Sequence, residues 1–257
     1  MAYWLDQFHI FLLVLLRVSA LLMAAPIFGH RNFLGRAKIA LAFMVSLIIF
    51  PLVADQGIQV PESLFPYVFM MVREVLMGLV LGFAVLLLFV GVQFAGQLAG
   101  LQMGFGIVNV IDPMSSNQLS IIGQFLNILA ILVLLSINGH HIILGGVMNS
   151  FDAVPLGGAV ELNTAVMDKL IAISAQVFVV AVKISAPILV ALFLVSVAMG
   201  IMARTVPQMN VFIVGFPLQI GVGLVTVAVS LPLFYSLITK LITAMERDLF
   251  ALIGFFA

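Results

Sequence analysis

Four charged residues stand inside long apolar stretches, and they are the first candidates for chemistry. They are Arg17, Arg73, Glu74 and Lys183. A charge at the centre of a bilayer costs about 2.5–3.5 kcal/mol on insertion scales, so such side chains pair with one another or face water. Because Arg73 and Glu74 are adjacent, they point to different helix faces, which leaves Arg17 or Lys183 as the partner of Glu74. We therefore expect a structural ion pair, with a wet lumen or a proton relay as the alternatives; one glutamate among permanent cations makes a poor relay.

The other reactive residues do not form a recognisable site. His140 and His141 are adjacent and would point apart on a helix, and the next carboxylate is Asp152, so we predict a polar turn and no metal site. The sequence has no cysteine, which excludes disulfides and thiolate ligands. There is no P-loop, GxSxG or HExxH motif, and the near-GxGxxG around Gly104 lacks its third glycine. We predict a protein that is not an enzyme and needs no cofactor.

A glycine-rich but apolar stretch, residues 96–117, separates two hydrophobic segments. Glycine permits backbone conformations that side chains forbid, whereas the intervening residues are too apolar for a solvated loop. Irregular backbone at membrane depth survives only inside protein or beside a water-filled cavity. The stretch is therefore interpreted as a gate or plug in an internal passage. The residues assigned to it are Met103, Gly104, Phe105, Gly106, Ile107, Val108, Asn109, Val110, Ile111, Asp112, Pro113 and Met114.

Small and amide residues recur at helical spacing upstream of this stretch. Gly78 and Gly82 are four apart, Gly96 and Gly100 are four apart, and the amide residues are Gln93 and Gln97. Small residues at this spacing let helices approach closely in lipid, and amides can hydrogen-bond to a neighbouring helix. They predict helix packing within the chain or against other subunits, and the excess of small residues favours other subunits.

The composition shows what kind of protein positions these residues. Of the 257 residues, 64% are hydrophobic and only 8% charged, and the mean hydropathy is +1.33. An average soluble domain is about 25% charged, so this is an integral membrane protein. The net charge is zero and there is no basic run, so no nucleic acid is expected as a partner. The N-terminus lacks a basic region and a small-residue cleavage site, and is interpreted as a retained helix.

A spanning helix needs about 20 apolar residues, and this criterion predicts an all-α protein of about six long, partly kinked hydrophobic helices. The expected segments are 10–28, 39–54, 65–99, 119–137, 170–203 and 211–239. The fourth is expected to continue past Asn138 as a short piece. Pro187, Pro217 and Pro232 lie inside the last two and predict kinks. The positive-inside rule puts the loops carrying Arg31 and Arg204 in the cytoplasm, with both termini outside.

Several motifs in order resemble the FliR family of flagellar type III export-gate proteins. They are Arg73-Glu74 with Gly78 and Gly82, AGQLAGLQMGFG from Ala95, Asp112-Pro113, Asn138-Gly139-His140-His141, Ser150-Phe151 with Pro155, and PQMNVFIVGFPLQIGVGL from Pro207. Relatives often carry Asp after the AGQL block, where this chain has Gly100. The set covers most of the chain. The motif VGFPLQI at residues 214–220 favours the flagellar branch of the family over the injectisome branch.

The resemblance implies a bacterial inner-membrane subunit of the flagellar basal body. It implies a pore formed with FliP and FliQ subunits, FlhB and FlhA beside it, and unfolded flagellar proteins as cargo. It also implies a single export-gate domain in which residues 1–151 resemble FliP and residues 169–257 form a FliQ-like hairpin, with the stretch at 104–118 as plug. A small-solute transporter is the less favoured alternative, since neither inverted repeats nor a midplane polar site is visible.

Overall fold

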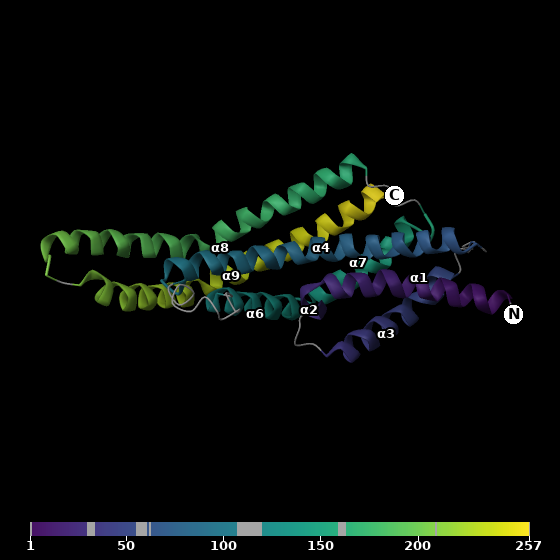
Figure 1. Ribbon diagram of the computed structural model, residues 1–257, viewed down its shortest axis with the longest axis horizontal. Helices are drawn as coiled ribbons and strands as arrows, with labels where there is room; N and C mark the ends of the chain where they lie inside the picture. The colour runs from purple at the N-terminus through teal and green to yellow at the C-terminus, as the bar shows by residue number, and fades with distance from the viewer. Residues whose placement is uncertain are drawn as a thin grey trace. The chain divides into compact units, whose positions relative to one another are not determined.

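The protein is built from α-helices throughout the described part of the chain. The computed structural model describes residues 2–29, 34–54, 61, 63–106, 120–158, 163–208 and 210–256. The helices in chain order are α1 (Ala2–Ala24), α2 (Pro26–Gly29), α3 (Gly35–Ala54), α4 (Leu64–Gln102), α6 (Ile121–Ser136), α7 (Gly139–Ala153), α8 (Thr164–Thr205) and α9 (Val211–Phe256) (Figure 1). No strand occurs among these residues, which confirms the all-α class.

Five of these helices are long and apolar enough to cross a membrane by themselves: α1, α3, α4, α8 and α9. A sixth span results within the described residues if α6 and α7 are counted as one broken helix. The break falls at Asn138, which adopts the left-handed conformation with φ 57° and ψ 27°. Asparagine tolerates this conformation better than most side chains, so the predicted short piece after Asn138 forms as α7.

The ends of several helices differ from the sequence-based limits, most of all in α9. The sequence predicted an end at Thr239, yet the helix continues to Phe256. The charges at Glu246, Arg247 and Asp248 made this part unlike a spanning segment. Packing explains the extension, since Ile242, Met245, Leu249, Leu252 and Ile253 are all buried at helical spacing.

The first segment was also misplaced. It was predicted over 10–28, whereas α1 begins at Ala2 and ends at Ala24. The chain then bends at Ala25 and restarts as α2 at Pro26. Proline suits the first position of a helix because it has no N–H to leave unpaired there. Prolines 187, 217 and 232 instead lie inside continuous helices.

The chain packs as two compact units that do not follow sequence order. Unit 1 comprises residues 1–87, 138–174 and 242–257, and unit 2 comprises residues 88–137 and 175–241. The proposed division into a FliP-like and a FliQ-like part therefore remains a prediction.

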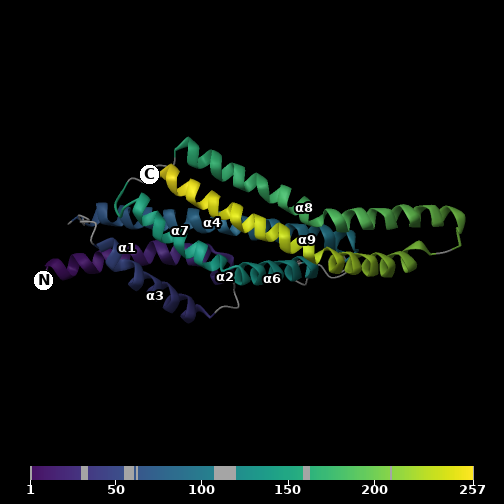
Figure 2. The same cartoon turned by 180° about the vertical axis from the view of Figure 1, so that it is seen from behind.

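In unit 1, α3 lies along α1, as both views of the ribbon show (Figures 1 and 2). Phe11 makes edge contacts with Phe43 and Phe50, at 5.4 and 5.8 Å between ring centroids. The buried residues of α3 are Ala42, Ser46, Ile49 and Val53. This spacing defines one helix face, and the small residues Ala42 and Ser46 on it permit close approach.

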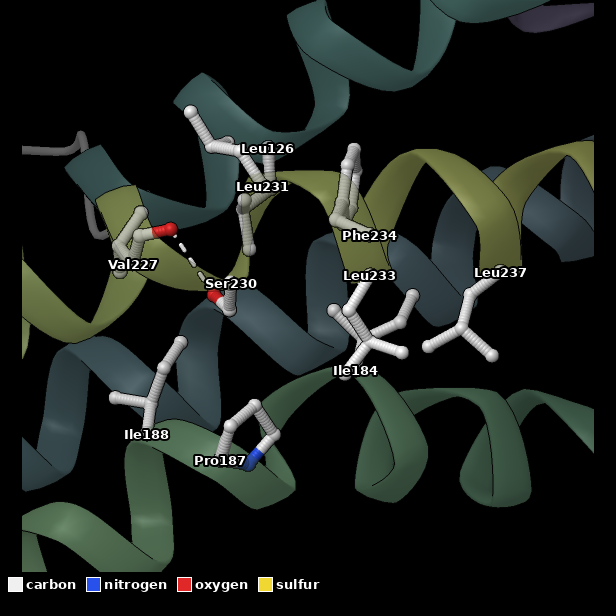
Figure 3. Close-up of a pocket in the computed structure, with 10 residues that line it drawn as sticks. All are labelled: Leu126, Ile184, Pro187, Ile188, Val227, Ser230, Leu231, Leu233, Phe234 and Leu237. Carbon is white, nitrogen blue, oxygen red and sulfur yellow. Dashed lines mark hydrogen bonds between the residues drawn. The ribbon is translucent and has the colours of Figure 1, made fainter.

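In unit 2, α8 and α9 lie side by side and enclose a small apolar cavity (Figure 3). Its volume is about 10 Å³, which is at the lower limit for holding one water molecule. Pro187 and Ser230 line it from the two helices. The Ser230 hydroxyl donates to the Val227 carbonyl at 3.0 Å, so the polar group is satisfied within its own helix.

Candidate functional site

The charged centre of unit 1 is an ion pair between α1 and α4. Arg17 is fully buried and Glu74 is 2% exposed. The Arg17 Nε donates to Glu74 Oε2 at 2.6 Å. Of the two cations that the sequence offered to Glu74, Arg17 is therefore the one that lies beside it. A charge-assisted bond of this length is strong where water is excluded.

The remaining Arg17 donors point to the end of α7. Its NH1 group donates to the Ser150 carbonyl at 2.8 Å, and both NH1 and NH2 donate to the Val154 carbonyl at 3.1 Å. The Ser150 carbonyl also accepts from the Val154 N–H at 3.0 Å, whereas carbonyls at a helix end lack partners within that helix. Arg17 therefore satisfies the Val154 carbonyl and adds a second bond to that of Ser150. The guanidinium also lies 4.2 Å from the Phe151 ring centroid. Arg17 thereby joins three helices that are distant in the sequence.

The turn after α7 also reaches the cluster. Its Gly157 backbone lies beside the Glu74 carboxylate. Gly157 has φ +81°, a conformation that a side chain at this position would strain. The cluster thus fixes the turn over residues 154–158 as well as the helices.

Glycines on α4 bring the helix close enough to α1 for this pair to form. A Cβ at Gly78 would collide with the Arg17 carbonyl oxygen, and a Cβ at Gly82 would lie 2.5 Å from the Ala24 Cβ. The first small-residue pair therefore packs within the chain, against α1. Close backbone approach of this kind is what small residues at four-residue spacing allow.

Sequence reasoning assigned no role in this cluster to Ser150, Phe151 and Val154. Ser150 and Val154 contribute mainly backbone carbonyls, which any residue carries, so their identity held no signal. The one clue was that Ser150-Phe151 belongs to the motifs that resemble the FliR family.

The other two predicted charges lie apart from the cluster. The Arg73 guanidinium lies 4.4 Å from the Phe69 ring centroid on its own helix. Lys183 is exposed on α8, and no described residue pairs with it. Its satisfaction by a partner subunit remains a prediction.

The second small-residue stripe packs α4 against α6 in unit 2. A Cβ at Gly96 would lie 2.6 Å from the Gly123 nitrogen and still nearer its Cα. Ser120, which caps α6, donates its hydroxyl to the Gly96 carbonyl at 3.0 Å. A Cβ at Gly100 would meet the same hydroxyl. The described contacts at these two glycines are thus within the chain.

Gln93 and Gln97 lie on a different side of α4 from these two glycines. They line an open cavity of about 310 Å³ together with Phe94, Val177 and Phe178. Among the described residues neither amide has a hydrogen-bond partner. Contact with another subunit stays the prediction for this pair.

The start of the predicted plug is described, and it is a capped helix end. The Gly104 N–H donates to the Leu101 carbonyl at 3.1 Å, and the Phe105 N–H donates to the Gly100 carbonyl at 3.0 Å. Gly104 has φ +89°. These are the two bonds and the left-handed glycine of a Schellman motif, which ends a helix by turning the chain away from its axis.

The capped end is held against α9. Met103 is fully buried, and a Cβ at Gly223 would lie 2.6 Å from its Cγ. A Cβ at Gly104 would lie 2.9 Å from Phe216 Cδ1. Phe105 and Gly106 follow, half-buried. The remaining plug residues, Ile107, Val108, Asn109, Val110, Ile111, Asp112, Pro113 and Met114, lie outside the described residues.

The histidine pair lies in the first turn of α7, so the polar turn predicted for it is wrong; the turn lies at residues 137–138. The His140 and His141 ring centroids are 4.2 Å apart, so the rings do not point apart as expected. No group of three metal-ligating side chains occurs within the described ranges.

Helices of this length and apolarity, joined by a buried ion pair and by glycine contacts, define a multi-pass α-helical membrane protein. The family described as bacterial export proteins, family 1, matches residues 8–245. The chain belongs to this family.

The curated relatives carry one name. The chain is 37% identical to the flagellar biosynthetic protein FliR of Bacillus subtilis (strain 168), over 97% of this chain and 98% of the relative. It is 31% identical to the protein of that name from Escherichia coli (strain K12), over 90% of this chain and 87% of the relative. The Pectobacterium carotovorum protein of that name is 30% identical, over 91% and 87%. These matches confirm the resemblance to the FliR family and a multi-pass inner-membrane protein.

Proposed function

We propose that the chain is a subunit of the flagellar type III export gate. In this role it forms with FliP and FliQ subunits a pore for unfolded flagellar proteins, next to FlhB and FlhA. The flagellar names of its relatives support the flagellar branch over the injectisome branch. It acts as a passage and not as an enzyme, and it needs no cofactor or metal.

Residues 103–114 are the plug of this pore in our proposal. The observation that carries the proposal is the Schellman turn at Gly104, which ends a 39-residue apolar helix and turns the chain aside. Met103 and Gly104 rest against Gly223 and Phe216, which supplies a fixed base for the segment that follows. An apolar segment on a fixed base suits a closure that excludes ions while the pore is idle.

The closing chemistry is dewetting. Phe105, Ile107, Val108, Val110 and Ile111 are apolar, and an apolar constriction blocks ions because water leaves it. Gly104 and Gly106 provide the points of movement for an arriving cargo chain. Asp112 and Pro113 have the residue types of a helix N-cap and first turn, which would return the chain to the bilayer.

Deletion of residues 106–116 tests the proposal. We expect a complex of normal yield, when co-expressed with its partners, and an increased membrane conductance at rest. Val108→Asp should leak more mildly, because one charge rewets the constriction, and Val108→Leu is the matched control that should stay tight. Normal complex yield with conductance equal to the unaltered protein would place the closure outside this segment.

A further inference from the structure

The first turns of α3, before Ala42, do not pack against α1. Ala42 is the first buried residue of α3 in chain order. Arg36 and Ile39, in the turns before it, are exposed and Lys38 is half-buried. The N-terminal turns of α3 therefore leave α1 without direct packing, and a space opens between the two helices.

This space is an apolar cavity of about 170 Å³. Its wall is formed by Leu15, Leu22, Phe28, Ala42 and Phe43, from α1, α2 and α3. Ser19 also lines the cavity, but its hydroxyl donates a hydrogen bond to the Leu16 carbonyl at 3.1 Å. An apolar cavity on the order of 150 Å³ stays dry and admits a hydrocarbon of about the size of benzene. The volume therefore suits a segment of one acyl chain, not a polar ligand.

The cavity opens at the exposed surface of the helix pair. Its lining residues Met23 and Ile39 are 61% and 66% exposed. A dry cavity open at this level of a membrane helix is in reach of the acyl chains of the bilayer.

One cation stands at the wall of the cavity. The Lys38 Nζ donates to the Gly29 carbonyl at 3.0 Å, and an ammonium has three donors. No carboxylate in the described ranges forms an ion pair with it. The N-terminus of α3 adds positive charge nearby. The opening is therefore complementary to an anionic group that is joined to an apolar chain.

We propose that this cavity binds an anionic phospholipid of the surrounding bilayer, with one acyl chain between α1 and α3 and the phosphate at Lys38. The basic end of α3 adjoins a loop that the positive-inside rule assigns to the cytoplasm, so the lipid belongs to the inner leaflet. This inference does not depend on the export role, and either can fail without the other.

Photo-labelling of the full chain in membrane vesicles from expressing cells tests the proposal. The probe is phosphatidylglycerol with a diazirine in one acyl chain, compared with a phosphatidylcholine of the same chain. We expect labelled peptides at residues 15–23 and 38–43, with phosphatidylglycerol labelling these at least about fivefold more. That ratio is what one cation near a headgroup supplies. Equal labelling by both lipids, or labelling only elsewhere, would overturn the proposal.

Two variants and one control variant locate the effect. Lys38→Gln should reduce labelling by phosphatidylglycerol about fivefold, whereas Arg36→Gln removes a charge from the same helix without altering the cavity wall and should change it less than twofold. Ser19→Met fills the cavity and should abolish labelling by either lipid while the thermal midpoint of the purified protein holds. An equal loss in Lys38→Gln and Arg36→Gln indicates diffuse surface charge, and unchanged labelling of Ser19→Met shows that no chain enters; both outcomes contradict the proposal.

Discussion

Two junctions on the same helix, α4, are built from the same small-residue spacing but are held in different ways. Near Gly78 and Gly82, α4 meets α1, and a buried network around Arg17 and Glu74 is added to the close contact. At Gly96 and Gly100, α4 meets α6 through backbone contact and a single serine hydroxyl.

The two junctions differ in the kind of substitution that disrupts them. A network of charged hydrogen bonds fails when one partner is removed, because the other charge is left buried and unpaired. A glycine contact is destabilised more strongly as the side chain that replaces the glycine becomes larger. The first junction is thus sensitive to chemistry, and the second is sensitive to size.

The largest expected effect is at the charged junction. Glu74→Ala leaves Arg17 buried without its counter-ion and should cost roughly 3–5 kcal/mol. It should lower the thermal midpoint in detergent and the yield of complex with FliP and FliQ. Arg73→Ala is the matched control, since among the described residues Arg73 makes only a cation–π contact, with Phe69, worth about 0.5–1 kcal/mol. Equal small losses in both variants would show that the cluster is not a dry network.

The next effect, about 1–3 kcal/mol or more, belongs to the glycine junction. Gly96→Leu and Gly100→Leu should separate α4 from α6 and reduce both the thermal midpoint and co-purification of the partner subunits. Gly200→Leu is the control, because a Cβ at Gly200 meets nothing within 4 Å. If Gly96→Leu behaves like Gly200→Leu, the α4–α6 contact is not a tight one.

The smallest effect is expected at an ion pair that is only partly buried, and it shows how much full burial adds. Lys169 Nζ and Asp248 Oδ1 are 2.7 Å apart, with side chains 26% and 21% exposed. A double-mutant cycle with Lys169→Met and Asp248→Asn should give a coupling energy of about 1 kcal/mol or less, decreasing with salt. A coupling as large as that of Arg17 with Glu74 would mean that burial is not what separates the two pairs.

The sequence predicted the helices well and their partners poorly. Apolar runs of spanning length gave the class and most segments, because hydropathy is a local property. Glu74 could be assigned two candidate partners but not one, since Arg17 is 57 residues away in the chain and only packing brings it close.

The end of α9 shows a second limit of local reading. Three consecutive charged residues begin at Glu246, so the composition there is unlike that of a spanning segment. The buried residues of this part, which include Met245 and Leu249, nevertheless recur at helical spacing. Periodicity, and not hydropathy, would have predicted this extension.

The partners of Arg17 are synthesised well after Arg17 itself, so the cluster forms late during synthesis of the chain. Glu74 follows Arg17 by 57 residues and Ser150 follows it by 133. At about 5–20 residues per second, Arg17 waits roughly 3–11 s for its counter-ion and about 7–27 s for the carbonyls of α7. During that interval a lone guanidinium must snorkel to the headgroups or stay with the insertion machinery. The first helix of this protein therefore reaches its final depth only after more than half of the chain has been made.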